Sequence, residues 1–156
     1  MRLPSGLTYL SILLHVTEAL YSGKYCPSAC DLVLNYATFN DTEPWLSKRV
    51  RSCRSELRVT SVYLCFAEYC KDDGEREKWI EEQRPWCDEH AGVTLPAYHD
   101  VVDSWTPERR AALKRLSADE AQEWPTLDEV VVPEAHFFDR AYTTMVLASR
   151  LSNILG

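Results

Sequence analysis

Glycine is scarce in this chain, with only five residues among 156. No glycine-rich loop is available to cradle the phosphates of a nucleotide. The four histidines, His15, His90, His99 and His136, show no i, i+4 pairing suited to a metal or a haem. Carboxylates are abundant, but they occur as helical runs, and none is singled out as a general acid with a partner. The sequence therefore predicts no catalytic residue and no metal site of its own.

An excess of positive charge is also missing. The formal net charge is −7, which argues against a general nucleic-acid binder, because such proteins need Lys and Arg to neutralise phosphates. Residues 20–70 carry six basic and five acidic side chains, whereas residues 71–139 carry eight basic and eighteen acidic ones. Solvated helix faces are the favoured explanation of this acidity, and direct binding of ferric ions by carboxylates is the alternative.

No hydrophobic run is long enough to span a membrane. The apolar run Leu7–Leu14 follows the basic residue Arg2, and Ala19 ends a tolerable signal-peptidase site. We therefore expect a signal peptide and a mature chain that is secreted or lies at the extracytoplasmic face of the plasma membrane; a retained amphipathic helix is the alternative. The sequon at Asn40 agrees with secretion and predicts a glycoprotein. The expected parts are the signal peptide, 1–19, a cysteine-rich domain, 20–142, and a C-terminal tail, 143–156.

The cysteines are even in number and fall within one stretch: Cys26, Cys30, Cys53, Cys65, Cys70 and Cys87. Such a set in an oxidising compartment predicts three disulfides, for which fifteen pairings are possible. On antiparallel helices, Cys26 and Cys30 can be bridged twice to Cys65 and Cys70, which leaves Cys53 for Cys87. Zinc is the competing interpretation, but the loose spacing and the unmatched histidines disfavour it.

Apolar periodicity predicts a mainly α fold, a small disulfide-stapled helical domain with loops. Thr106 and Pro107 form a helix start, with Thr as the N-cap and Pro at the first helical position. One basic helix face should carry Arg51, Arg54 and Arg58. The expected helices are 26–40, 45–70 with a break near residue 53, 75–83 ended by Pro85, 106–123, and 133–142 or beyond; residues 88–104 are expected as loop and 127–132 as extended chain.

Several phrases of the chain, taken in order, resemble the extracytoplasmic N-terminal region of fungal ferric- and cupric-chelate reductase transmembrane components. The resemblance spans about residues 25–142 and is most specific in its cysteine-bearing half. The matching pieces are Cys26 and Cys30 with Tyr36, then Thr38-Phe39-Asn40-Asp41-Thr42, Arg51-Ser52-Cys53, Leu57–Cys65, Tyr69-Cys70, Leu127–Pro133 and Arg140-Ala141-Tyr142.

This resemblance implies a role in iron or copper reduction and uptake. In the family, a membrane core holds haem between paired histidines, and a cytoplasmic part binds FAD and NADPH. None of these cofactor modules is found in this sequence, which departs from the family after Tyr142 and stops before a membrane segment. We therefore expect a non-catalytic domain whose partners are metal chelates or a membrane reductase core. The alternative is a stand-alone small secreted cysteine-rich interaction protein.

Overall fold

Helices dominate the computed structural model, which describes the backbone of residues 23–155 and side chains as far as residue 152. The mainly α prediction is confirmed, whereas the expected signal peptide, 1–19, lies outside the described residues. The described helices are α2 (Tyr25–Leu34), α3 (Lys48–Arg54), α4 (Glu56–Tyr69), α5 (Asp73–Trp86), the π-helix η1 (Cys87–Ala91), α6 (Tyr98–Asp103), α7 (Pro107–Ala111), α8 (Ala118–Gln122) and α9 (Ala135–Leu155). Four short strands complete the fold: β1 (Thr38–Phe39), β2 (Lys114–Leu116), β3 (Thr126–Leu127) and β4 (Val131–Pro133).

The six cysteines form three disulfides that tie the helices together. Helices α2 and α4 are bridged twice, by Cys26–Cys70 and Cys30–Cys65, with Cα separations of 5.6 and 5.9 Å. The third disulfide, Cys53–Cys87, joins the end of α3 to η1. This is the pairing that the spacing of the cysteines favoured, and it leaves no free cysteine among the described residues.

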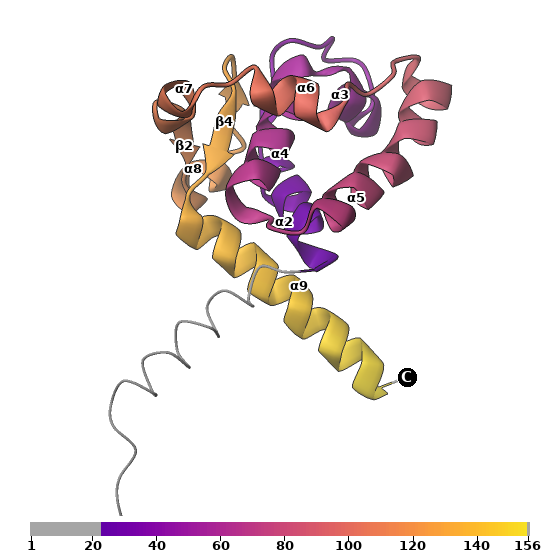
Figure 1. Cartoon of the computed structure of the whole chain (residues 1–156), viewed down its shortest axis with the longest axis vertical. Helices are drawn as coiled ribbons and strands as arrows, with labels where there is room; N and C mark the ends of the chain where they lie inside the picture. Colours follow the sequence, from indigo (N-terminus) through magenta and orange to yellow (C-terminus); the bar gives the residue numbers. More distant parts are fainter. Residues whose placement is uncertain (1–22, 156) are drawn as a thin grey trace, which may run out of the picture.

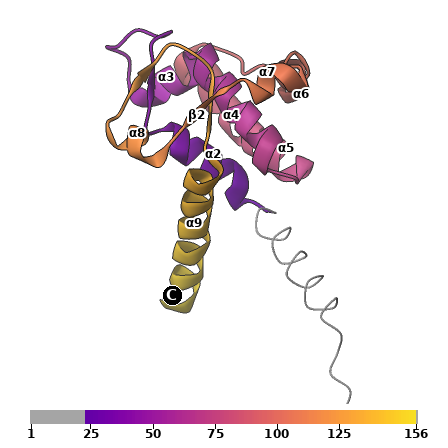
Figure 2. The same ribbon diagram turned by 90° about the vertical axis from the view of Figure 1, so that its left-hand side faces the viewer.

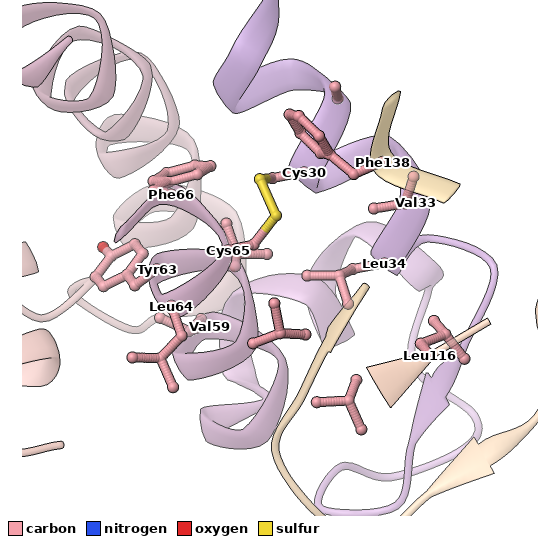
Figure 3. Close-up of a cluster of buried hydrophobic side chains, with 14 of the residues drawn as sticks. Cys30, Val33, Leu34, Val59, Tyr63, Leu64, Cys65, Phe66, Leu116 and Phe138 are labelled. Carbon is pink, nitrogen blue, oxygen red and sulfur yellow. A yellow bond between two sulfur atoms is a disulfide. The ribbon is translucent and has the colours of Figure 1, made fainter. Parts of the chain in front are cut away.

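Around the Cys30–Cys65 bridge lies the centre of the core (Figure 3). The side chains of Phe66 on α4 and Phe138 on α9 are completely buried, as is Leu34 on α2. The ring of Phe138 also stacks on Tyr69 at a centroid distance of 4.4 Å. Helix α2 lies between α4 and α9 in this core, because it contacts both of them.

Two expected helices are interrupted because the chain forms parallel strand pairs there. The first helix ends at Leu34 rather than near Asn40, and β1 then pairs with β3. The helix that Thr106 caps ends at Ala111 rather than near Glu123, since β2 pairs with β4. Strand partners this distant in sequence give no local sign of the pairing. Prediction from local periodicity alone therefore made both helices too long.

The break near Cys53 is confirmed, because α3 and α4 meet at Ser55. The Ser55 side chain, only 2% exposed, accepts a hydrogen bond from the backbone N–H of Arg58 and donates one to Asp41. A buried cap of this kind fixes where α4 begins.

Pro85 does not end the third helix, contrary to expectation. It lies inside α5, and the helical path continues through η1. Two tertiary contacts hold this continuation, the Cys53–Cys87 disulfide and a 2.8 Å hydrogen bond from Arg54 Nε to the carbonyl of Ala91. Residues 88–104 are consequently not a simple loop, since they include most of η1 and all of α6.

Helix α9 extends well past the rest of the domain, and both views show its C-terminal half pointing away from the other helices (Figures 1 and 2). It takes in most of the segment expected as a divergent tail, up to Leu155. On its outer face, Leu147 and Leu151 are 53% and 59% exposed. None of the helices from residue 23 to 155 has the length and apolar character to cross a membrane.

Candidate functional site

A cavity of about 430 Å³ lies between α2, α3, α4 and α5, and we refer to it as the main pocket. This volume is within the range typical of small-molecule sites. One part of its wall is apolar and aromatic: Val59, Val62, Tyr63, Trp79, Trp86 and Leu95. The other part is polar and includes three basic side chains: Asp31, Asn35, Lys48, Arg49, Ser52, Arg58 and Gln83. The main pocket is therefore amphipathic.

Arg58 anchors the polar wall. Its Nη2 lies 2.5 Å from Asp31 Oδ1 and 3.1 Å from Asn35 Oδ1, and Asn35 Nδ2 donates in turn to the second oxygen of Asp31. The expectation of a single basic face is wrong for Arg58, which is only 8% exposed, whereas Arg54 on α3 is exposed. The break at Ser55 changes the helix direction, so these arginines do not share one face.

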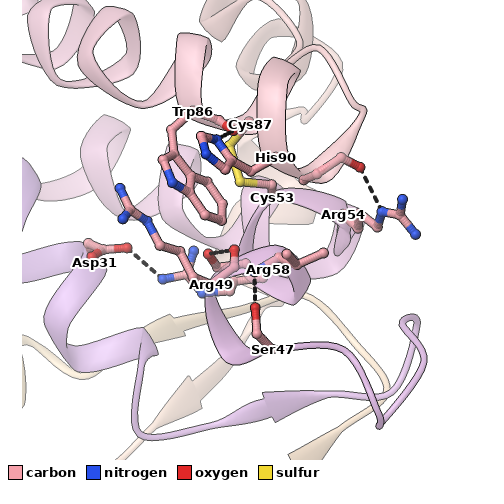
Figure 4. Close-up of a disulfide and its surroundings, with 12 residues drawn as sticks. Asp31, Ser47, Arg49, Cys53, Arg54, Arg58, Trp86, Cys87 and His90 are labelled. Atoms are coloured by element: carbon pink, nitrogen blue, oxygen red, sulfur yellow. Dashed lines mark hydrogen bonds and ion pairs between the residues drawn. A yellow bond between two sulfur atoms is a disulfide. The ribbon is translucent and has the colours of Figure 1, made fainter.

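On the other side of the pocket, Trp86 is held between two cationic or ionisable groups (Figure 4). The guanidinium of Arg49 lies 4.1 Å from the centre of its ring, and His90 stacks parallel to it at 4.9 Å. The Cys53–Cys87 disulfide forms part of the same wall. Since Arg49 and Trp86 come from α3 and α5, this disulfide fixes the separation of the two sides of the pocket.

Lys48 completes the basic part of the wall. Its ammonium donates a 2.7 Å hydrogen bond to the backbone carbonyl of Asn35 and lies 5.1 Å from the ring centre of Trp124. Because the only carboxylate of the wall, Asp31, is already paired with Arg58, the charges of Lys48 and Arg49 leave the main pocket positive. The pocket thus differs in sign from the whole chain.

Tyr63 lies in the apolar wall, and its hydroxyl donates a 3.1 Å hydrogen bond to the carbonyl of Pro96. Burial raises the pKa of Tyr63 to about 12, since removal from water disfavours the phenolate. The folded state therefore prefers neutral Tyr63. Its contribution to stability is complete below the unfolded-state pKa of about 10 and is lost as the pH rises towards 12.

We expect Tyr63→Phe to lower the free energy of unfolding at pH 7 by about 1 kcal/mol, because the Pro96 carbonyl loses its donor. Above pH 10 the variant should lose stability less steeply than the native chain, because it lacks the phenol whose ionisation in the unfolded state favours unfolding. Urea unfolding between pH 8 and 11 measures both effects. The matched control is Tyr36→Phe at an exposed ring. Parallel curves for the native chain and Tyr63→Phe would contradict this account.

Asn40, the expected glycosylation site, lies outside the main pocket. It lines a broad groove of about 960 Å³ formed by α4, α6 and the chain around Asp128 and Val130. Its backbone N–H donates a 2.9 Å hydrogen bond to the carbonyl of Leu127, and the residue is exposed. The exposed side chain leaves room for a glycan, and glycosylation stays a prediction.

The histidines of the described chain are exposed and lie apart from one another. His90 stacks on Trp86, His99 contacts Tyr98 edge-on, and His136 lies 3.6 Å from Glu134. From residue 23 to 155, no group of three or more His, Cys, Asp and Glu side chains is arranged to hold a metal ion.

Sequence reasoning missed the main pocket. Its members come from separate helices, and periodicity within each helix does not show which faces meet. One signal was present, however, because Arg58 interrupts the otherwise apolar and small-residue run Leu57–Cys65. A charged residue within a buried run is costly unless it is paired, so Arg58 pointed to a buried carboxylate partner elsewhere in the chain.

Comparison of the chain with protein-family models, with curated proteins and with solved structures finds no match.

Proposed function

We propose that the chain is a non-catalytic extracytoplasmic domain, related to the N-terminal region of ferric- and cupric-chelate reductases, that binds metal chelates in the main pocket. The observation that carries this proposal is the positive, aromatic-lined cavity in a domain stapled by three disulfides. The disulfides support an oxidising compartment, and the secreted or membrane-attached location belongs to the same proposal.

A chelated ferric ion already has its oxygen ligands, so a protein that binds the complex does not need to supply any. Recognition then depends on the organic surface and the charge of the chelate. Ferric complexes of polycarboxylate chelators are anionic, and Lys48 and Arg49 offer complementary charge at the main pocket. Trp79 and Trp86 add apolar rings for the organic part of the chelate.

Electron transfer lies outside this role. The haem, FAD and NADPH of the reductase family belong to other modules, and the proposed partner that carries them is a membrane reductase core. In this arrangement the domain raises the local concentration of chelate beside the core. A purified chain supplied with NADPH, flavin and a ferric chelate should accordingly give no turnover above the blank.

Titration calorimetry with ferric–EDTA provides the binding test. We expect saturable binding of the iron complex, which Lys48→Gln and Arg49→Gln should each weaken about fivefold through loss of a facing positive charge. Arg140→Gln removes an equal charge from an exposed site on α9 and should change nothing. Absence of saturable binding for several ferric chelates of different charge would reject this function and leave the stand-alone secreted interaction protein as the better description.

A further inference from the structure

The groove that Asn40 lines, which we refer to as the broad groove, has an apolar floor. Its volume of about 960 Å³ is more than twice that of the main pocket. Five apolar side chains of its wall pack against the core and yet remain partly exposed: Leu57, Val93, Val101, Trp105 and Val130. Accessible apolar surface with a polar rim is typical of protein interaction sites.

Trp105 is the largest side chain of this floor. The guanidinium of Arg109 lies 4.3 Å from the centre of its ring, and Arg109 Nη1 donates a 3.2 Å hydrogen bond to the carbonyl of Ser104. Trp and Arg are the residues that most often dominate the binding energy of a protein interface, once a partner covers them. Trp105 is therefore the expected anchor for a partner in the broad groove.

The rim of the broad groove is negatively charged. Its four carboxylates and two guanidiniums give a net charge of −2, and they belong to Asp41, Glu56, Asp100, Asp128, Arg54 and Arg109. Both guanidiniums already donate to backbone carbonyls of the domain. Glu56, Asp100 and Asp128 are exposed, and none of them forms a salt bridge with another residue that the structure describes. The rim is therefore complementary to Lys or Arg side chains of a partner.

We propose that the broad groove is the docking surface for a basic and apolar segment of a partner protein. The apolar side chains of this segment cover Trp105 and the floor beside it, and its Lys or Arg side chains lie against Glu56, Asp100 and Asp128. The main pocket has the opposite charge, so it takes a different kind of ligand. This inference goes beyond the proposed function, because it requires no metal chelate and names the chemistry of a protein partner.

The test measures the fluorescence anisotropy of three short labelled peptides with the native chain. The first peptide alternates Lys and Leu, the second has Glu in place of Lys, and the third has Ser in place of Leu. We expect the Lys–Leu peptide to bind at least about tenfold more tightly than either of the others, because only this peptide matches both the rim and the floor. Its affinity should fall as the salt concentration rises. Equal affinity of the Lys–Leu peptide and either of the others would overturn the inference.

Matched variants then assign the binding to the broad groove. Glu56→Gln and Asp100→Asn should each weaken the Lys–Leu peptide about threefold, whereas Glu77→Gln, at an exposed position of α5 outside the groove wall, should have no effect. Trp105→Leu should weaken it about tenfold, and Trp45→Leu, at an exposed ring outside the groove wall, should not. Equal losses in the groove variants and their controls would mean unspecific attraction to an acidic chain, and the inference would be wrong.

Two other occupants of the broad groove would be detected by the same approach. A glycan on Asn40 that fills the groove would block the Lys–Leu peptide until the glycan is removed enzymatically. A second copy of the chain would give a dimer in sedimentation, which Trp105→Leu would dissociate. Either result would replace the proposed partner. The proposed function fails separately, when ferric–EDTA does not bind while the Lys–Leu peptide does.

Discussion

Replacement of Cys53 and Cys87 together with alanine should lower the free energy of unfolding by about 4 kcal/mol. The two residues are 34 apart, and their disulfide closes this whole length of chain in the unfolded state. Neither of the other two disulfides shortens this loop in the unfolded state, because Cys87 lies outside both of the loops that they close. A loss of this size is a large part of the stability of an ordinary domain. Urea unfolding of the oxidised variant, followed by circular dichroism, measures it.

The matched comparison is removal of Cys30 and Cys65, which are 35 apart and completely buried. Their loop is nested inside the loop of Cys26–Cys70. With that outer bridge intact, the unfolded chain is already closed, and only the short segments between neighbouring cysteines gain freedom. We therefore expect a smaller loss, about 3 kcal/mol. All four cysteines are at least nine-tenths buried, so the cost of the cavity left behind is similar for both pairs.

The order of the two losses tests the physical cause. If chain entropy dominates, the Cys53–Cys87 disulfide is the more costly one to remove. A clearly larger loss for Cys30 and Cys65 would mean that packing at the centre of the core outweighs loop closure. Chain entropy makes a second prediction. Removal of both α2–α4 disulfides should cost more than the two single removals added together, because the long loop is opened only when neither disulfide remains.

The disulfides were predictable because their geometry is local. A spacing of four in one helix and five in the other puts each pair of cysteines on one face, and two such faces meet only when the helices are antiparallel. The helix start at Thr106 was predictable for the same reason. An N-cap residue acts on its own helix, and the Thr106 side chain accepts a hydrogen bond from the backbone N–H of Arg109. These features depend on a few neighbouring residues.

The helix ends and the main pocket depend on distant residues instead. Thr38 is extended because it pairs with Thr126, which no feature of the sequence near Thr38 indicates. Pro85 is tolerated within a helix because Cys87, two residues later, is tied to Cys53. The main pocket needs four helices in place before any of its side chains face one another. The sequence limited the fold class, and long-range contacts decided the site.

Replacement of Asp31 with alanine should lower the free energy of unfolding by about 2 kcal/mol. Arg58 is only 8% exposed, and without Asp31 its guanidinium keeps Asn35 as its only side-chain partner. This loss is smaller than that expected for breaking a fully buried ion pair. The reason is that both residues line the main pocket, where water can reach the guanidinium. Urea unfolding at neutral pH and low salt provides the measurement.

The reverse change, Arg58→Met, should cost less, about 1 kcal/mol. The Asp31 side chain is 32% exposed and still accepts from Asn35, so it tolerates the loss of its cation, and methionine fills part of the space of the arginine stem. The double variant Asp31→Ala, Arg58→Met should be more stable than Asp31→Ala alone, because the unpaired buried charge is gone. If the two single losses simply add in the double variant, Asp31 and Arg58 are not coupled. The polar wall would then be held by Asn35 and the Ser55 cap rather than by the ion pair.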